Sequence, residues 1–420
     1  MTSMIKVVAW LGAVGLGLAA VLALVPQLSG ERVSANDFVY DYLSARALVE
    51  GDDPYGHLDV LERRYLGSEP FGVRDVARAN PHPPALIVAL GPLGTLSLPA
   101  ARATWLAIGA VSYILAGFLL ARGVGWSLAT GVAVGIGLLA VPVVGRDLAY
   151  GQSNGPLLLL MVLCWRTVKS GRWRALGGIA LGVAGALKLF PLLLLIPLLR
   201  LRQIRAAVWA VGALIVSTLA ASAVVGFGRV VELATDIGPQ NAAEWGPAPM
   251  NLSLVSIPRR WLTTNRWYEA LDLGTLATVL AALVFIALIG VVVLHRGGRT
   301  GDLFWSAIPV MLLASPITWD FSLPLVLPLA LQLVRRSIQD RQPPSIPVMV
   351  ALTVVAIGVP PGLPLPEVAS PAAQLLGYAL PTYALVILAA VGMGSSERGP
   401  TDASAEPADE RAARAAMKTD

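Results

Sequence analysis

Four charged residues stand within or beside long apolar stretches of the chain: Arg146, Asp147, Lys188 and Asp320. A charge at membrane depth is costly, so each is a candidate functional residue. Structural alternatives stay open. Arg146 and Asp147 can form an ion pair with each other, and Lys188 can extend its long side chain to the membrane surface. Asp320 can cap the helix that follows it.

A fifth candidate is Asp37, in the polar stretch "NDFVYDYLSARALVEGDDPYG" at residues 36–56. Asn36 suits an N-cap, Asp37 falls in the first helical turn, and Gly51 ends the helix. An interrupted apolar stripe predicts a helix that lies along the membrane surface, formed by Phe38, Leu43, Ala45, Leu48 and Val49. The alternative for Asp37 is a capping role only.

The elements that position these residues are predicted to be membrane helices. Of the 420 residues, 56% are hydrophobic and 14% are charged, against about 25% charged residues in a soluble domain. The stretch 7–25 is apolar throughout, whereas a barrel strand alternates polar and apolar residues. We therefore expect an all-α polytopic membrane protein.

The apolar segments predict a bundle of roughly 10–13 transmembrane or half-membrane helices. They lie at 7–27, 84–98, 103–121, 127–145, 154–165, 175–199, 206–226, 270–294, 303–334, 346–360 and 372–393. The first is read as an uncleaved signal anchor, with a cleaved signal peptide as the alternative. We expect residues 1–394 to form the membrane domain and residues 395–420 a disordered cytoplasmic tail.

Four basic clusters set the expected orientation, because Lys and Arg favour cytoplasmic loops. They are Arg166/Lys169/Arg172/Arg174, Arg200/Arg202/Arg205, His295/Arg296/Arg299 and Arg335/Arg336/Arg341. Segments 175–199 and 303–334 then have both ends inside, which favours hairpins that break at "LKLFP" and "SPITWD". One long kinked helix remains an alternative, and it stays fully open for 175–199. The loops 28–82 and 227–268 are expected outside.

Some functional classes find no support in the sequence. The net charge of +5 is accounted for by the topology signals, so we expect no nucleic-acid partner. There is no nucleotide-binding fingerprint, no nucleophile elbow and no metal-ligand cluster of His and Cys. We expect no cofactor; if a divalent metal is needed, the available carboxylates are those of Asp37, Asp41, Asp147 and Asp320.

Six sequence blocks in order resemble glycosyltransferase family 87. The first is "DFVYDYLSARALVEGDDPYG", similar to the family's Asp-Phe-x-x-Tyr-x-x-Ala…Gly-x-x-Pro-Tyr signature. The others are "HPPALIVALGPLGTLSLPAARATWL", "GQSNGPLLLLMVLCW", "LGGIALGVAGALKLFPLLLLIPLL", "NLSLVSIPRRWL" and "LLASPITWDFSLPLVLPLAL". Together they span about residues 35–335.

The resemblance implies a GT-C fold whose active site faces the periplasm, with the first polar helix on that side. It also implies a polyprenyl-phosphate sugar donor, a glycolipid or polysaccharide acceptor, and contact with membrane lipids in the plasma membrane. An inverting mannosyltransferase of cell-envelope glycolipid assembly is the expected activity. An arabinofuranosyltransferase is the first alternative, and a lipid or sugar-carrier transporter and a non-catalytic assembly factor are more distant ones.

The same resemblance implies roles for individual residues. Asp37 occupies the position of the family's general base. Donor-phosphate candidates are Lys188, Arg146, Arg259 and Arg260, and candidates for the acceptor side or the pocket are Tyr40, Tyr42, His82, Gln152, Asn154, Asn251, Trp319 and Asp320. Two departures from the family pattern are present. His82 stands where the family has Tyr, and Phe321 and Ser322 replace a pair of histidines.

Overall fold

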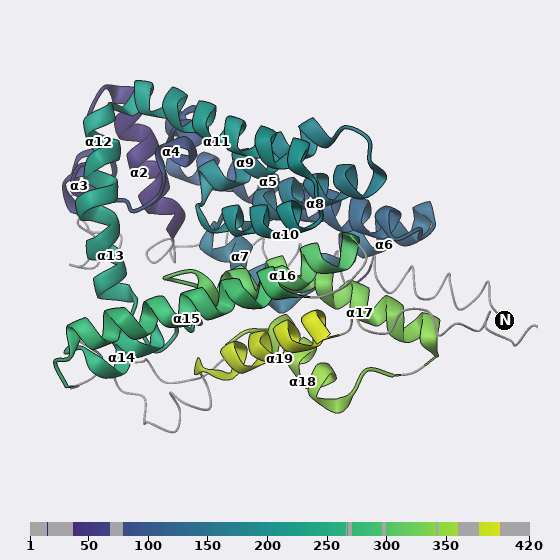
Figure 1. Ribbon diagram of the computed structural model, residues 1–420. Coiled ribbons are helices and arrows are strands. Elements are labelled where there is room, and N and C mark those ends of the chain that lie inside the picture. The colour runs from purple at the N-terminus through teal and green to yellow at the C-terminus, as the bar shows by residue number, and fades with distance from the viewer. Residues whose placement is uncertain are drawn as a thin grey trace, which may run out of the picture.

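The protein is a bundle of helices in the computed structural model, which describes residues 37–67, 79–265, 267, 271–295, 300–341, 343–359 and 378–394, and Gly15. All regular elements within these residues are helices (Figure 1). The prediction of an all-α polytopic protein is confirmed. The predicted anchor at 7–27, the N-cap residue Asn36 and the tail at 395–420 lie outside the described residues.

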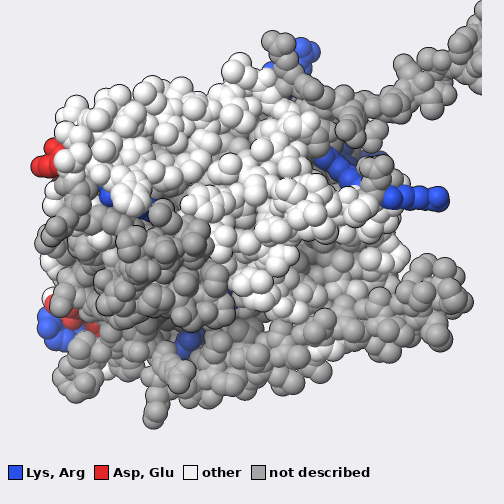
Figure 2. Space-filling model, turned by 90° about the horizontal axis from the view of Figure 1, so that it is seen from below, with Lys and Arg blue, Asp and Glu red and all other residues white. Residues whose placement is uncertain are grey.

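Within the described residues, four helical runs are long and apolar enough to cross a membrane. They are α5 (Leu98–Gly123), α11 (Ile204–Val225), α15 (Gly274–Leu294) and the run Asp320–Gln339, which joins η4 (Asp320–Val326) to most of α17 (Leu327–Asp340). On the face in Figure 2, charged side chains gather toward the two ends of the molecule, and most of the described surface between them is uncharged. This distribution suits a bundle that crosses a bilayer.

Shorter helices complete the bundle. Those before residue 200 are α2 (Asp37–Glu50), α3 (Leu58–Leu66), α4 (Pro84–Gly94), α8 (Asn154–Ser170), α9 (Arg174–Leu187), η2 (Phe190–Leu194) and α10 (Leu195–Arg200). Those after it are α12 (Phe227–Glu232), η3 (Leu233–Ile237), α13 (Gly238–Trp245), α14 (Ile257–Leu262), α16 (Thr300–Ala314), α18 (Ile346–Ile357) and α19 (Leu380–Gly394). In Figure 1, α2, α3, α12 and α13 lie at the same end of the bundle.

The segment 175–199 folds back on itself, as the hairpin prediction requires. Helix α9 ends at Leu187, and Lys188 is extended. Gly178 lies against Ala206 and Gly182 against Ala210, so α9 and α11 run parallel. The chain between them, through η2 and α10, must therefore return to the end from which α9 started. Lys188 consequently lies at the turn of the hairpin, between the two arms.

The segment 303–334 also breaks where predicted. Helix α16 ends at Ala314 and η4 begins at Asp320, and both η4 and α17 pack against α16. Asn251, in the loop after α13, stabilises the backbone at this break. Its amide donates to the carbonyl oxygens of Gly246 and Pro316, each at 3.0 Å, and its oxygen accepts from the backbone N–H groups of Ser253 and Thr318.

The apolar segment 127–145 is not one straight span, which corrects the sequence prediction. It divides into α6 (Leu128–Leu138) and α7 (Pro142–Tyr150), bent by 58°. Pro142 lies in the first turn of α7, where its missing N–H costs no helical hydrogen bond. The polar residues 145–150 are therefore helical, and Gly151, with φ +66°, turns the chain into α8. The bend directs one face of α7 into the bundle interior.

Helix α2 is more enclosed than its apolar stripe predicted. It packs against α3, α4 and α5, and its buried residues include Asp41 and Ser44 as well as Phe38 and Leu43. Val49, a predicted stripe residue, is instead 44% exposed. The reason is that α2 contacts other helices on several sides, which a single-stripe pattern does not predict. Its polar side chains are thereby held inside the protein.

Candidate active site

Two carboxylates of α2 form the centre of the candidate site. Asp37 and Asp41 are one helical turn apart and share a face of the helix. Asp41 is buried, and its Oδ1 accepts hydrogen bonds from Asn80 Nδ2 at 2.9 Å and from His82 Nδ1 at 2.6 Å. Asn80 Nδ2 also donates to Ser44 Oγ at 3.1 Å. The chain before α4 thus binds directly to α2.

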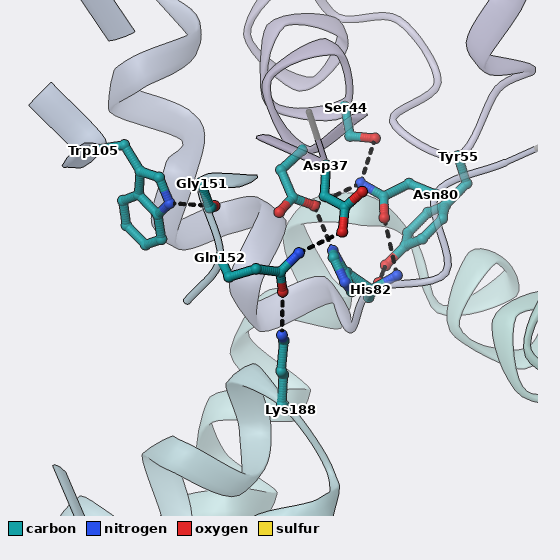
Figure 3. Close-up of polar contacts among 10 residues, drawn as sticks. Asp37, Ser44, Tyr55, Asn80, His82, Trp105, Gly151, Gln152 and Lys188 are labelled. Atoms are coloured by element: carbon teal, nitrogen blue, oxygen red, sulfur yellow. Dashed lines mark hydrogen bonds and ion pairs between the residues drawn. The ribbon is translucent and has the colours of Figure 1, made fainter. Parts of the chain in front are cut away.

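The other carboxylate, Asp37, is linked to a lysine through one amide (Figure 3). Lys188 Nζ donates to Gln152 Oε1 at 2.8 Å, and Gln152 Nε2 donates to Asp37 Oδ2. An ammonium can only donate and an ionised carboxylate can only accept, so these two partners fix the orientation of the amide. Segments that are distant in sequence, α2, the turn before α8 and the hairpin after α9, thus meet at Gln152.

Trp105 of α5 contacts the chain neighbours of both Gln152 and Asp37. Its indole N–H donates to the carbonyl oxygen of Gly151 at 2.7 Å, and its ring stacks on Phe38 with centroids 6.3 Å apart. Phe38 is the chain neighbour of Asp37, and Gly151 is the neighbour of Gln152. One tryptophan therefore sets the spacing between the base candidate and its amide partner. This role could not be predicted from the sequence, because Trp105 looks like any aromatic residue in an apolar helix.

The environment shifts the protonation of the central carboxylate. Burial raises the pKa of Asp37 from 3.8 to about 6, while the electrostatic effects of His82 and Lys188 act in the opposite direction. A carboxyl with a pKa near 6 is a stronger base than an ordinary aspartate, yet it is mostly ionised at neutral pH. These are the properties that a general base requires.

A second buried carboxylate lies deeper in the bundle. Asp147 of α7 accepts from Tyr113 Oη and from Asn154 Nδ2, each at 2.7 Å. Asn154 Nδ2 also donates to the carbonyl oxygen of Phe321 at 2.9 Å, which ties α8 to η4. The electrostatic neighbours of Lys188 include Asp147 as well as Asp37. Asn154 was predicted as a pocket residue, and its contacts place it next to this second carboxylate.

Arg146 does not pair with its chain neighbour Asp147, so the ion pair considered from the sequence is wrong. Its guanidinium pairs with Asp320 at the start of η4 and donates to the carbonyl oxygen of Val359 at 3.0 Å. Arg146 therefore joins α7 to η4 and to the end of α18. Beside this pair, the Trp319 ring contacts Trp245 and Phe321, with centroids 5.9 and 6.4 Å apart.

Three residues predicted for binding are engaged by the protein itself. Tyr42 is buried and donates to the carbonyl oxygen of Leu96 at 2.8 Å. The Asn251 amide makes four hydrogen bonds to backbone atoms, which uses its two donors and both acceptor positions. Arg260 Nη2 donates to the carbonyl oxygens of Ala248 and Asn251. Sequence alone missed these roles because polar side chains that bind loop backbone have no sequence signature.

The remaining predicted residues, Tyr40 and Arg259, are partly exposed. Tyr40 packs against the apolar cluster that surrounds α2. Arg259 lies on α14 beside Arg260, and within the described residues no hydrogen bond or ion pair joins it to Asp37 or Lys188. Among the described residues, no three His, Cys, Asp or Glu side chains are grouped so that they could hold a metal ion. Lys188 is thus the cation that the described structure brings to Asp37.

Comparison with known proteins defines the class. The model of glycosyltransferase family 87 matches residues 81–316, which is more than half of the chain. The chain therefore belongs to glycosyltransferase family 87, and its long apolar helices are those of a multi-pass membrane protein. The matched range includes His82, Gln152 and Lys188, and Asp37 precedes it.

Two curated relatives are more specific. Both are named alpha-(1->3)-arabinofuranosyltransferase, from Mycobacterium tuberculosis strains CDC 1551 / Oshkosh and ATCC 25618 / H37Rv. Each is 31% identical to the chain over 194 residues, and the match covers 44% of this chain and 41% of the relative. The match therefore spans about two fifths of the length of these relatives. No solved structure matches the chain.

Proposed function

We propose that this protein is an inverting glycosyltransferase that uses a polyprenyl-phosphate sugar as donor. Its acceptor is a hydroxyl group of a glycolipid or polysaccharide at the outer face of the plasma membrane. The observation that carries the proposal is the link from Asp37 through Gln152 to Lys188. It places a base and a cation on either side of one amide, inside a membrane bundle.

The proposed reaction is a single displacement. Asp37 removes the proton of the acceptor hydroxyl while the hydroxyl oxygen attacks the anomeric carbon. The bond between that carbon and the phosphate oxygen breaks, and its electron pair leaves with the phosphate. Lys188 stabilises the negative charge of the departing phosphate. Attack opposite the leaving group inverts the anomeric centre, and phosphate needs no dedicated acid to leave.

A lipid-linked donor suits this architecture. The described residues form helices only, so they contain no α/β domain of the kind that usually binds a nucleotide sugar. The hairpin turn at Lys188 instead brings a cation from an apolar segment to the buried face of α2. A donor with its polyprenyl chain among apolar helices would present its phosphate to this turn. We expect no metal requirement, and transfer in the presence of EDTA tests this.

Two sugars are the leading candidates. Mannose is the first, from the resemblance of the sequence blocks to family members that transfer mannose. Arabinofuranose is the second, and the names of the two mycobacterial relatives favour it specifically. Transfer assays with the two donors in separate reactions distinguish them.

The orientation that we propose places α2, α3, α12 and α13 outside and the basic clusters inside. The chain has a single cysteine, Cys164, which is buried. The accessibility of cysteines introduced one at a time can therefore be measured with a membrane-impermeant thiol reagent in intact cells. Position 57, in the exposed loop before α3, should label from outside. Position 172, in the basic loop before α9, should not.

The functional test uses purified protein in lipid nanodiscs with envelope lipids as acceptor. Radiolabelled polyprenyl-phosphomannose and polyprenyl-phosphoarabinose are supplied in separate reactions. We expect label to enter the lipid or glycan fraction from one of the two donors, and the Asp37→Asn protein to serve as the inactive control. Movement of either donor across liposome membranes, with no transfer of its sugar, would support the transporter alternative instead.

A further inference from the structure

The Asp41–His82 pair has no part in the reaction described so far, although it adjoins Asp37. The Asp41 side chain is 7% exposed and the His82 side chain is 23% exposed. The imidazole therefore lies between a buried carboxylate and open space. In Figure 3, the His82 ring lies close to Asp37.

Asp41 determines which ring nitrogen of His82 remains available. An ionised carboxylate only accepts hydrogen bonds, so Nδ1 carries the proton in the 2.6 Å contact. In the neutral imidazole, Nε2 then has a lone pair. Within the described part of the chain, no residue hydrogen-bonds Nε2. His82 thus presents Nε2 as an oriented hydrogen-bond acceptor, because the buried Asp41 carboxylate fixes the tautomer of the imidazole through Nδ1.

The backbone of His82 is held independently of its ring. The His82 N–H donates to Asn80 Oδ1 at 3.0 Å, and the Tyr55 hydroxyl donates to the His82 carbonyl oxygen at 2.9 Å. Pro81 and Pro83 flank the residue and restrict the backbone further. The imidazole is therefore not needed to hold the backbone of this loop. Its Nδ1 serves the buried Asp41 carboxylate, and its Nε2 is left for a ligand.

We propose that His82 binds the acceptor sugar: its Nε2 accepts a hydrogen bond from a hydroxyl next to the one that Asp37 deprotonates. This inference rests on the proposed function. In a single displacement, the acceptor lies opposite the leaving phosphate. The acceptor hydroxyl must contact its base, Asp37, and the His82 ring lies close to Asp37 in Figure 3, so both side chains can contact one acceptor ring.

The acceptor class that follows is a polyol with two adjacent hydroxyls, such as a terminal pyranose, furanose or inositol ring. One hydroxyl is the nucleophile at Asp37, and the other is held by His82. Asp41 and Asn80 act through His82, so they are positioning residues. An acceptor that lacks the second hydroxyl should lose the contact with Nε2 and little else.

The test compares acceptor and donor kinetics in wild type and His82→Phe. Octyl α-mannoside and octyl arabinofuranoside are the acceptor probes, each with its deoxy analogue at the ring position next to the reacting hydroxyl. Losing one oriented hydrogen bond should raise the acceptor KM about tenfold in His82→Phe and leave the donor KM within about twofold. Wild type should discriminate against the deoxy probe by a similar factor, and His82→Phe should not discriminate.

Further variants separate acceptor binding from folding. His82→Gln keeps an acceptor atom near the position of Nε2 and should recover part of the loss. Asp41→Asn keeps an oxygen for Nδ1 and should give a smaller defect than Asp41→Leu. His57→Phe alters a histidine that is 69% exposed and lies outside the site, so both KM values should stay unchanged. Thermal unfolding of each variant reports its folding.

An unchanged acceptor KM in a folded His82→Phe protein would overturn the inference, as would a defect confined to the donor KM. Equal use of the normal and the deoxy probes by wild type would overturn it too. Failure of the proposed function looks different, because wild type would then transfer sugar from neither donor to any acceptor.

Discussion

Acidification below pH 6 should remove most of the transferase activity. The proposed base is the ionised form of Asp37, whose pKa is about 6. About nine tenths of the carboxyl is ionised at pH 7 and about one tenth at pH 5, so kcat/KM should fall about ninefold across that interval. An aspartate with the ordinary pKa of 3.8 would remain almost fully ionised at pH 5, and the rate would change by less than about a tenth.

The assay is the initial rate of labelled-sugar transfer at low donor concentration, measured from about pH 4.5 to about pH 8. The donor is a phosphodiester and keeps one negative charge over this range. The fall in kcat/KM at low pH therefore reflects protonation of a group on the enzyme. Far-UV circular dichroism at each pH shows that the protein stays folded. Lys188→Met gives an internal check. Because Lys188 lowers the pKa of Asp37, the Lys188→Met protein should lose activity at a higher pH than wild type. A rate that stays flat down to pH 5 would refute the assignment.

Other substitutions test the parts of the site separately. Lys188→Met should also lower kcat/KM for the donor by about 10- to 100-fold, since a charge-assisted contact to phosphate is lost; an unchanged value would move phosphate binding elsewhere. Trp105→Phe keeps the stacking on Phe38 but loses the hydrogen bond to Gly151, so kcat should fall about three- to tenfold with normal thermal stability. Asn251→Ala should lower the free energy of unfolding by about 2–4 kcal/mol, measured by denaturation, because it leaves buried backbone groups unpaired; a stable protein would show that water replaces the amide.

The sequence predicted the parts of the fold that depend on local signals. Charge asymmetry and the break at "LKLFP" gave the turn at Lys188, because basic ends and a proline act on short stretches of chain. The helix of residues 37–50 was predicted with nearly its observed limits for the same reason, and Gly51 ends it with φ +79°. The full enclosure of α2 was not predicted, because it depends on several other helices.

The candidate site was predictable in its charges and not in its contacts. Lys188 was singled out because a charge is costly among apolar segments. Asp37 was singled out by its place in the first turn of a polar helix and by the family resemblance, which also pointed to Gln152. Which of them meet depends on helix packing, and no local pattern encodes the contact between residues 152 and 37. Asn80 and Trp105 carried no signal at all. The backbone contacts of Arg260 and Asn251 were not predicted, because a polar side chain that binds backbone and one that binds substrate look alike in sequence.

The central claim is that Asp37 is the base that activates the acceptor. The most direct measurement is labelled-sugar transfer by purified wild-type and Asp37→Asn proteins, alongside donor binding by both. Losing a positioned base should lower kcat about 10²- to 10⁴-fold, with donor affinity largely retained and with Asp41→Asn less impaired. Asp37→Asn should also be the more stable protein at pH 7, since it no longer holds a buried charge. Turnover by folded Asp37→Asn within about tenfold of wild type would contradict the account and direct attention to Asp147.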